Sequence, residues 1–118
     1  MVKMTILLRA GVMISAGEAY NDFLMKLEAL PGLRRKAVSD VYGSMSGPAP
    51  YTTLIEATFD SREALERALT SEPGVEAGHA LLRFAGRDAV VLYASTLEEA
   101  YPGPAGEEDE TLTGGGEV

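Results

Sequence analysis

Residues 51–65 constrain the fold of this chain most, because they indicate a strand that continues directly into a helix. Alternate apolar positions of that strand share one face: Ile55, Ala57 and Phe59. Asp60 stands at the place of a helix N-cap and Glu63 follows three residues later, so we expect Asp60 to cap a helix that begins at Ser61. The strand then packs one face under helices, and Glu56 projects from the opposite face.

Other segments with strand or helix periodicity surround this unit. We expect strands at 2–9, 33–42, 51–59 and 89–94, and helices at 15–30, 61–70 and 75–84. The small-residue stretch 43–50 is typical of a hairpin loop, and Glu72-Pro-Gly74 is expected to end the second helix. The β-α-β-β-α-β order predicts an α+β, ferredoxin-like fold, with a four-stranded antiparallel sheet and the helices on one face.

The acidity of the chain is concentrated near its end. Of 118 residues, 18 are acidic and 10 are basic, and seven of the acids but no base lie from Glu98 onward. The rest of the chain is nearly neutral and has no basic stripe suited to a nucleic acid, so we expect no nucleic-acid partner. We predict a folded domain over residues 1–97 and an acidic, Gly- and Pro-rich flexible tail over 98–118.

Composition argues against several kinds of site and location. No apolar run is long enough to span a membrane, and the first residues do not resemble a signal peptide, so we expect a cytoplasmic protein with no membrane partner. A chain without cysteine has neither disulfides nor thiolate metal sites. It also has a single histidine and no clustered set of ligands, so we expect no metal and no cofactor.

The predicted strands are apolar on both faces. Residues 6–8 and 90–93 are continuously apolar, and Leu54 lies on the face opposite Ile55. A sheet with helices on one side only would leave its second apolar face in water, which soluble monomers avoid. We therefore expect a homodimer that packs sheet against sheet around a two-fold axis, with a cavity or a packed core between the two sheets.

Three segments carry a resemblance to a known family. They are Leu30-Pro-Gly-Leu-Arg-Arg35, Glu56-Ala-Thr-Phe-Asp-Ser-Arg-Glu-Ala-Leu65 and Arg83-Phe-Ala-Gly-Arg-Asp-Ala-Val-Val-Leu-Tyr93. In this order they resemble EthD-like proteins, which are small dimeric α/β-barrel proteins. The resemblance covers about residues 2–95 and implies a ferredoxin-like protomer that dimerises through its open sheet face, with a pocket lined by strand residues.

The resemblance implies no single reaction, because this superfamily includes cofactor-free monooxygenases, lactone isomerases and haem proteins. The chain also departs from the family pattern. EthD-like chains usually carry a histidine near the end of the first helix, and residues 23–30 contain none. Any role that depends on that histidine is therefore in doubt.

Glu56 is the strongest candidate for chemistry. It lies between Leu54 and Thr58 on the face that a partner would cover, and desolvation there would suit it to act as a general base or a polar anchor. The alternative is a structural carboxylate that pairs with Arg9 or lies in water at the rim of the sheet.

Two tyrosines and the single histidine are the other polar candidates. Tyr42 and Tyr93 can orient a ligand or simply pack, and His79 can orient a ligand or ligate haem, although one histidine in a helix is more often a structural or surface residue. We expect a small organic ligand in a pocket on the open sheet face, bounded by these residues, Leu54 and Thr58. Cofactor-free oxygenation, isomerisation or degradation is one expectation, and a non-catalytic dimerisation or ligand-sensing module is the alternative.

Overall fold

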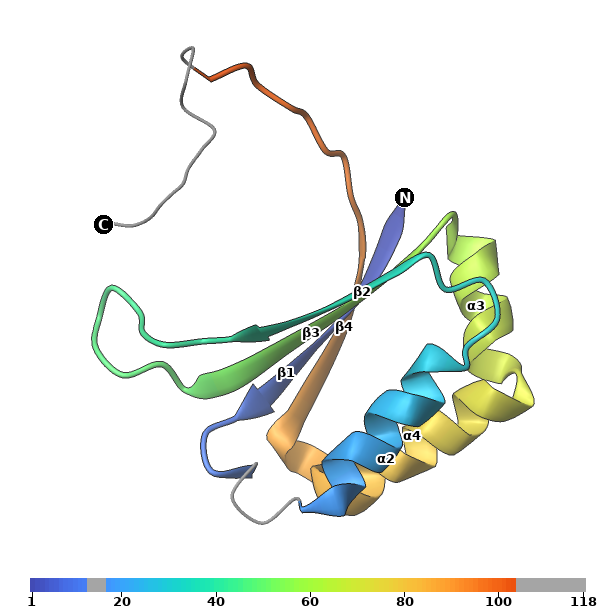
Figure 1. Ribbon diagram of the computed structural model, residues 1–118, viewed down its shortest axis with the longest axis horizontal. Helices are drawn as coiled ribbons and strands as arrows, with labels where there is room; N and C mark the ends of the chain where they lie inside the picture. Colours follow the sequence, from blue (N-terminus) through green and yellow to red (C-terminus); the bar gives the residue numbers. More distant parts are fainter. Residues whose placement is uncertain (13–16, 104–118) are drawn as a thin grey trace.

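The computed structural model describes residues 1–12 and 17–103. The elements in these ranges are the strands β1 (Val2–Arg9), β2 (Arg35–Asp40), β3 (Tyr51–Phe59) and β4 (Ala89–Ser95), the helices α2 (Glu18–Glu28), α3 (Arg62–Thr70) and α4 (Glu72–Phe84), and a 3-10 turn at Gly86–Asp88. Figure 1 shows the sheet with these three helices on one side of it. The expected α+β, ferredoxin-like fold is confirmed, with the second crossover divided into two helices.

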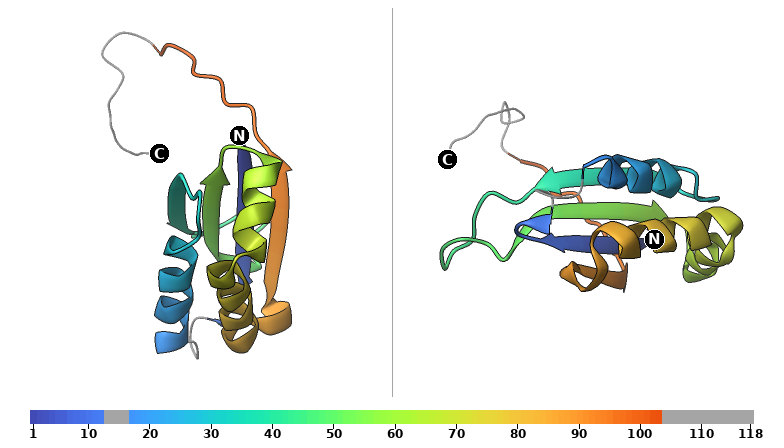
Figure 2. Two further views of the ribbon diagram at one scale, coloured as in Figure 1. Left: turned by 90° about the vertical axis from the view of Figure 1, so that its right-hand side faces the viewer. Right: turned by 90° about the horizontal axis from the view of Figure 1, so that it is seen from below.

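The four strands form one antiparallel sheet in the order β2-β3-β1-β4, so β1 and β3 are central and β2 and β4 are edges. The register places Ile6 beside Ile55 on the helix side, and Thr5 beside Glu56 and Leu92 on the opposite side. We call that opposite side the open face, because the helices lie on the other side of the sheet in all three views (Figures 1 and 2).

The hydrophobic core lies between the sheet and the helices. Its largest fully buried side chains are Phe23, Phe59, Ile6, Leu8, Leu27 and Ile55. Alternation along β1 and β3 supplies four of them, and a stripe spaced by four residues on α2 supplies Phe23 and Leu27. The expected helix-facing side of the third strand is thus confirmed.

Helix α3 starts one residue later than expected, and its cap is a different residue. Ser61, not Asp60, is the N-cap, and its hydroxyl accepts a hydrogen bond from the Ala64 N–H at 3.1 Å. Asp60 instead accepts hydrogen bonds from the Arg34 guanidinium. The expected role of Asp60 is therefore wrong, since a serine at the next position competes for the same backbone donors.

Helix α4 starts three residues earlier than expected. Helix α3 ends before Glu72, as the sequence indicates. Glu72, Pro73 and Gly74, however, form the first turn of α4, with Ser71 as its N-cap. Proline is favoured there, because the N–H that it lacks has no partner inside a helix at that position. Along α4, Val75 and Leu82 are exposed to solvent, and Ala77, Ala80 and Leu81 are buried.

Other boundaries differ less. Strand β2 is shorter than predicted, so Tyr42 lies in the loop after it. Residues 15 and 16 of the predicted first helix lie outside the described residues, as do residues 104–118 of the predicted tail. Among the helices described, none combines the length and the apolar character that crossing a membrane requires.

Candidate functional site

A narrow apolar cavity, here called the inner chamber, lies between the sheet and helices α2 and α4. Its volume is about 150 Å³, and its wall includes Met4, Ile6, Phe23, Leu27, Gly78 and Tyr93. Phe23, Leu27 and Ile6 are buried whereas Gly78 and Tyr93 are exposed, so the chamber runs from the surface into the core. Among the described residues that line it, Tyr93 supplies the single polar side chain, so the chamber suits an apolar group.

A larger depression, here called the outer hollow, lies between α3 and the edge strand β4. It has a volume of about 380 Å³, and its wall includes Val2, Arg62, Leu65, Glu66, Tyr93 and Ser95. Tyr93 and Leu69 line both cavities, so the chamber and the hollow are neighbours along β4. Together they offer an apolar interior beside a polar, charged exterior, the usual composition of a small-molecule site.

The junction of α3 and α4 shapes the inner chamber. The Ser71 hydroxyl donates to the Ala68 carbonyl at 2.6 Å and accepts from the Gly74 N–H at 3.2 Å, so one side chain ends α3 and begins α4. Gly74 lies so close to α3 that an added Cβ would be 2.1 Å from the Ala68 carbonyl oxygen. This contact fixes the sharp turn after which Ala77 and Gly78 line the chamber together with Val91 and Tyr93 of β4.

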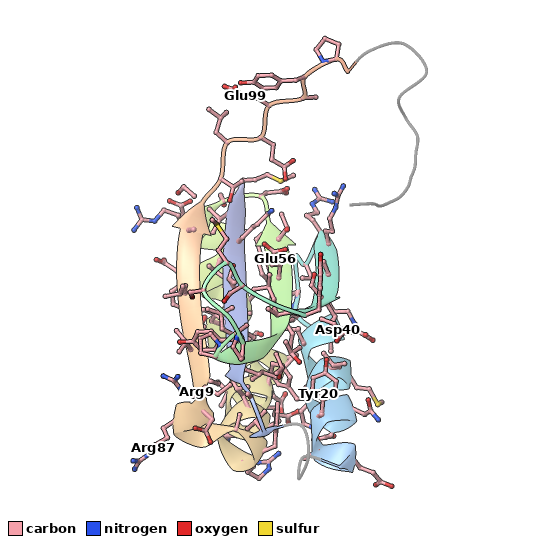
Figure 3. All side chains as sticks on the ribbon, turned by 90° about the vertical axis from the view of Figure 1, so that its left-hand side faces the viewer. Arg9, Tyr20, Asp40, Glu56, Arg87 and Glu99 are labelled. Carbon is pink, nitrogen blue, oxygen red and sulfur yellow. The ribbon has the colours of Figure 1, made fainter. Side chains whose placement is uncertain are left out.

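Glu56 lies on the open face, as the alternation of β3 predicts (Figure 3). Its side chain is 32% exposed, and one carboxylate oxygen is 3.9 Å from the Lys3 ammonium, which is also 3.6 Å from Glu98. The expected alternative partner, Arg9, instead lies over the Tyr51 ring, 5.2 Å from its centroid. Glu56 therefore has a cationic neighbour on its own face, but the neighbour is Lys3.

The open face divides into an apolar half and a polar half. Cross-strand pairing aligns Leu54, Leu7 and Val90 in one row, and the next row combines Leu92 and Ala37 with the polar Thr5 and Glu56. The row toward the start of β1 is polar or small: Arg35, Thr58, Lys3 and Ala94. The expected apolar residues on the second face of the sheet are present, but they are confined to one half of that face.

The structure does not bring the predicted site residues together. Leu54 and Thr58 share the open face with Glu56, and Thr58 is buried. Tyr93 pairs with Met4 on the helix side, so it cannot share a face with Glu56. Tyr42 is 95% exposed in its loop, and His79 is exposed on α4. The expected grouping of these residues around one open-face pocket is therefore corrected; neither cavity described above is lined by Glu56, Tyr42 or His79.

Three titratable groups outside the cavities have clearly perturbed pKa values: Asp60, its partner Arg34, whose pKa is raised by the same hydrogen bond, and Tyr20. The hydrogen bond from Arg34 lowers the pKa of Asp60, and the charge of Arg34 adds to this effect. Burial raises the pKa of Tyr20, and the nearby Asp40 carboxylate raises it further; Figure 3 labels both residues. Tyr20 also packs edge-on against Phe84, with ring centroids 6.0 Å apart. The perturbed pKa values of all three groups have structural explanations.

No metal site is evident within residues 1–12 and 17–103, where no three carboxylate or imidazole side chains converge on one point. The site residues that sequence reasoning missed are Arg62, Glu66, Gly78 and Ser95. Arg62 lies in the segment 51–65, for which the sequence predicted a helix start but no binding site. A glycine in the middle of an apolar helix was the available signal for Gly78.

Comparison with known proteins gives structural matches only. No family model matches the chain, and no curated protein matches it in sequence. An EthD family protein from Bacillus halodurans superimposes with a TM-score of 0.75 and 23% identity, over 82% of this chain and 99% of that one.

Two other solved structures show how widely the fold is used. A hydroxynitrile lyase from Passiflora edulis has a TM-score of 0.65 and 17% identity, over 86% of this chain and 96% of that one. A dimeric ferredoxin-like protein of unknown function from Jannaschia sp. has a TM-score of 0.61 and 20% identity, over 80% and 98% of the two chains. Identities this low establish the fold alone, and this chain has the ferredoxin-like fold of the EthD-like, dimeric α/β-barrel proteins.

Proposed function

We propose that this protein binds a small, largely apolar organic molecule in the inner chamber and the adjoining outer hollow. The observation that carries the proposal is an apolar chamber that reaches from exposed Gly78 to buried Phe23, beside a hollow with charged walls. A cavity of about 150 Å³ lined by apolar side chains is large enough for benzene. The volume of the hollow falls within the usual range of ligand sites.

Binding is tested by filling the chamber from one side. Gly78→Leu places a side chain in the entrance, and Glu76→Leu places the same side chain on an exposed position of α4 outside both cavities. We expect toluene to shift amide resonances of residues around the chamber in the wild-type protein and in Glu76→Leu, but not in Gly78→Leu. Shifts that are equal in all three proteins, or absent from the wild type, would contradict the proposal.

We also propose that the protein is a homodimer that pairs through the apolar half of the open face. Two observations support this assembly: Leu92, in the row next to Leu54, Leu7 and Val90, is 51% exposed, and a ferredoxin-like protein with the same fold is dimeric. Leu54→Asp would place a charge in the contact and is expected to give monomers in sedimentation at micromolar concentration. Leu82→Asp, on the exposed side of α4, is the control and should leave the dimer intact.

A second candidate function is catalysis by Glu56 in a space between the two sheets of that dimer. The supporting observation is a carboxylate already two-thirds covered in the protomer, on the face where a partner would exclude more water. Glu56→Gln would then abolish conversion of any compound that the wild-type protein consumes, with no change in the dimer. If no bound compound is consumed, the non-catalytic ligand-sensing alternative is favoured, in which Glu56 serves as the partner of Lys3.

A further inference from the structure

The outer hollow carries one cationic and one anionic side chain, both from α3. Arg62 and Glu66 are one helical turn apart and line the same wall. Over the part of the chain that the structure describes, neither side chain belongs to an ion pair, with the other or with any third residue. Both charged groups are exposed at the hollow and are available to a ligand.

Backbone groups of β4 add further donors and acceptors at the same place. The Thr96 N–H donates to the Met1 carbonyl at 2.9 Å, which makes Thr96 and Met1 a hydrogen-bonded pair. Because such pairs alternate along an antiparallel ladder, the peptide groups of Ser95 and Tyr93 point away from β1. Strand β4 is an edge of the sheet, so these peptide groups face outward beside the hollow.

The opposite charges of Arg62 and Glu66 on one wall would disfavour a ligand head group of either charge. An anionic head drawn to Arg62 would also meet the Glu66 carboxylate, and a cationic head drawn to Glu66 would meet the Arg62 guanidinium. A hydroxyl group avoids both repulsions, because its oxygen accepts from Arg62 while its O–H donates to Glu66. The inner chamber meanwhile takes an apolar body and offers only the Tyr93 hydroxyl to polar atoms.

We propose that the ligand is an uncharged alcohol or phenol whose apolar body fills the inner chamber. Its hydroxyl group is bound by Arg62 and Glu66 in the outer hollow. This inference rests on the proposed binding function and adds the chemical class of the ligand. Arg62 and Glu66 are thus specificity-determining residues, and each discriminates against the head group that has its own charge.

Three probes with the same ring separate the head-group chemistries: 2-phenylethanol, phenylacetate and phenethylamine, which are neutral, anionic and cationic at neutral pH. We expect 2-phenylethanol to bind most tightly in NMR titrations of the wild-type protein. Glu66→Gln should improve phenylacetate by roughly two- to fivefold, and Arg62→Gln should improve phenethylamine by a similar factor, as expected for partly solvated charges.

Matched controls come from the same helix. Glu63→Gln and Arg67→Gln remove the same charges from exposed positions that do not line the hollow, and they should leave the order of the three probes unchanged. Equal affinities for the three probes would overturn the head-group inference while binding in the chamber stands. The same holds if Glu66→Gln does not improve phenylacetate and Arg62→Gln does not improve phenethylamine. If no probe binds, or if Gly78→Leu does not weaken any of them, the proposed function itself fails.

Discussion

The two glycines of α4 give a sharp test of the junction that shapes the chamber, because the same substitution should have opposite effects at each. A Cβ at Gly74 would lie 2.1 Å from the Ala68 carbonyl oxygen and 2.7 Å from the Leu69 carbonyl oxygen. Both are backbone atoms in the last turn of α3, so they cannot rotate away. A Cβ at Gly78 would have nothing within 4 Å.

The expected magnitudes follow from these contacts. In a helix interior, alanine is more favourable than glycine by about 0.5–1 kcal/mol, so Gly78→Ala should stabilise the protein by about that amount. At Gly74 the same gain is outweighed by overpacking, which typically costs about 1–3 kcal/mol. We expect Gly74→Ala to be destabilising by about 1–2 kcal/mol, so the melting temperatures of the two variants should differ by roughly 10 °C.

Thermal unfolding followed by circular dichroism measures this difference. The protein concentration must be the same for all samples, because the proposed dimerisation would make the melting temperature depend on it. Urea unfolding provides an independent value of the free energy. If Gly74→Ala is as stable as the wild type, or if the two variants shift in the same direction, the tight approach of α4 to α3 is refuted.

Three further predictions concern the caps, an ion pair and the core. Ser71→Ala removes the cap shared by α3 and α4 and should lower the free energy of unfolding by about 1–2 kcal/mol in urea titrations. The folded-state pKa of Asp60 is depressed, so its stabilisation is present above the ordinary value of 3.8 and is lost as the pH falls through the folded value. Arg34→Met should therefore raise the Asp60 pKa in carboxyl NMR titrations, and the stability difference from the wild type should shrink below pH 3.8. Phe59→Ala empties a fully buried site and should cost about 3–5 kcal/mol in the same urea assay; a loss under 1 kcal/mol would contradict the assigned core.

The sheet and its helix-facing side could be predicted from the sequence because they depend on periodicity. Alternation in residues 51–59 identifies the face that carries Ile55 and Phe59, and the order of strands and helices then limits the topology. The start of α4 was missed because Pro73 and Gly74 are read as a helix stop. A serine followed by proline in the first turn is also a helix start, and only the packing against α3 decides between the two.

The cavities could not be predicted, because a void leaves no periodic pattern. The sequence indicates that apolar residues such as Phe23 and Ile6 belong to the core. Whether their side chains pack together or leave a cavity depends on three-dimensional packing. The arrangement of residues on the open face also could not be predicted from the sequence alone. The sequence indicates apolar residues there, but only the register of β1 with its neighbours aligns Leu7, Leu54 and Val90 in one half. Tyr93 was assigned to the wrong side because a continuous apolar strand does not reveal which alternate positions face the helices.

The position of Ser95 has a practical consequence for measuring occupancy. It is an exposed residue on the wall of the outer hollow, at the end of β4, and the sequence contains no cysteine. Ser95→Cys would therefore create a unique thiol for an environment-sensitive fluorophore, attached beside Arg62 without competing labels elsewhere. A dye in that place would change its emission when a compound enters the outer hollow. The labelled protein could then be used to screen chemical libraries by fluorescence.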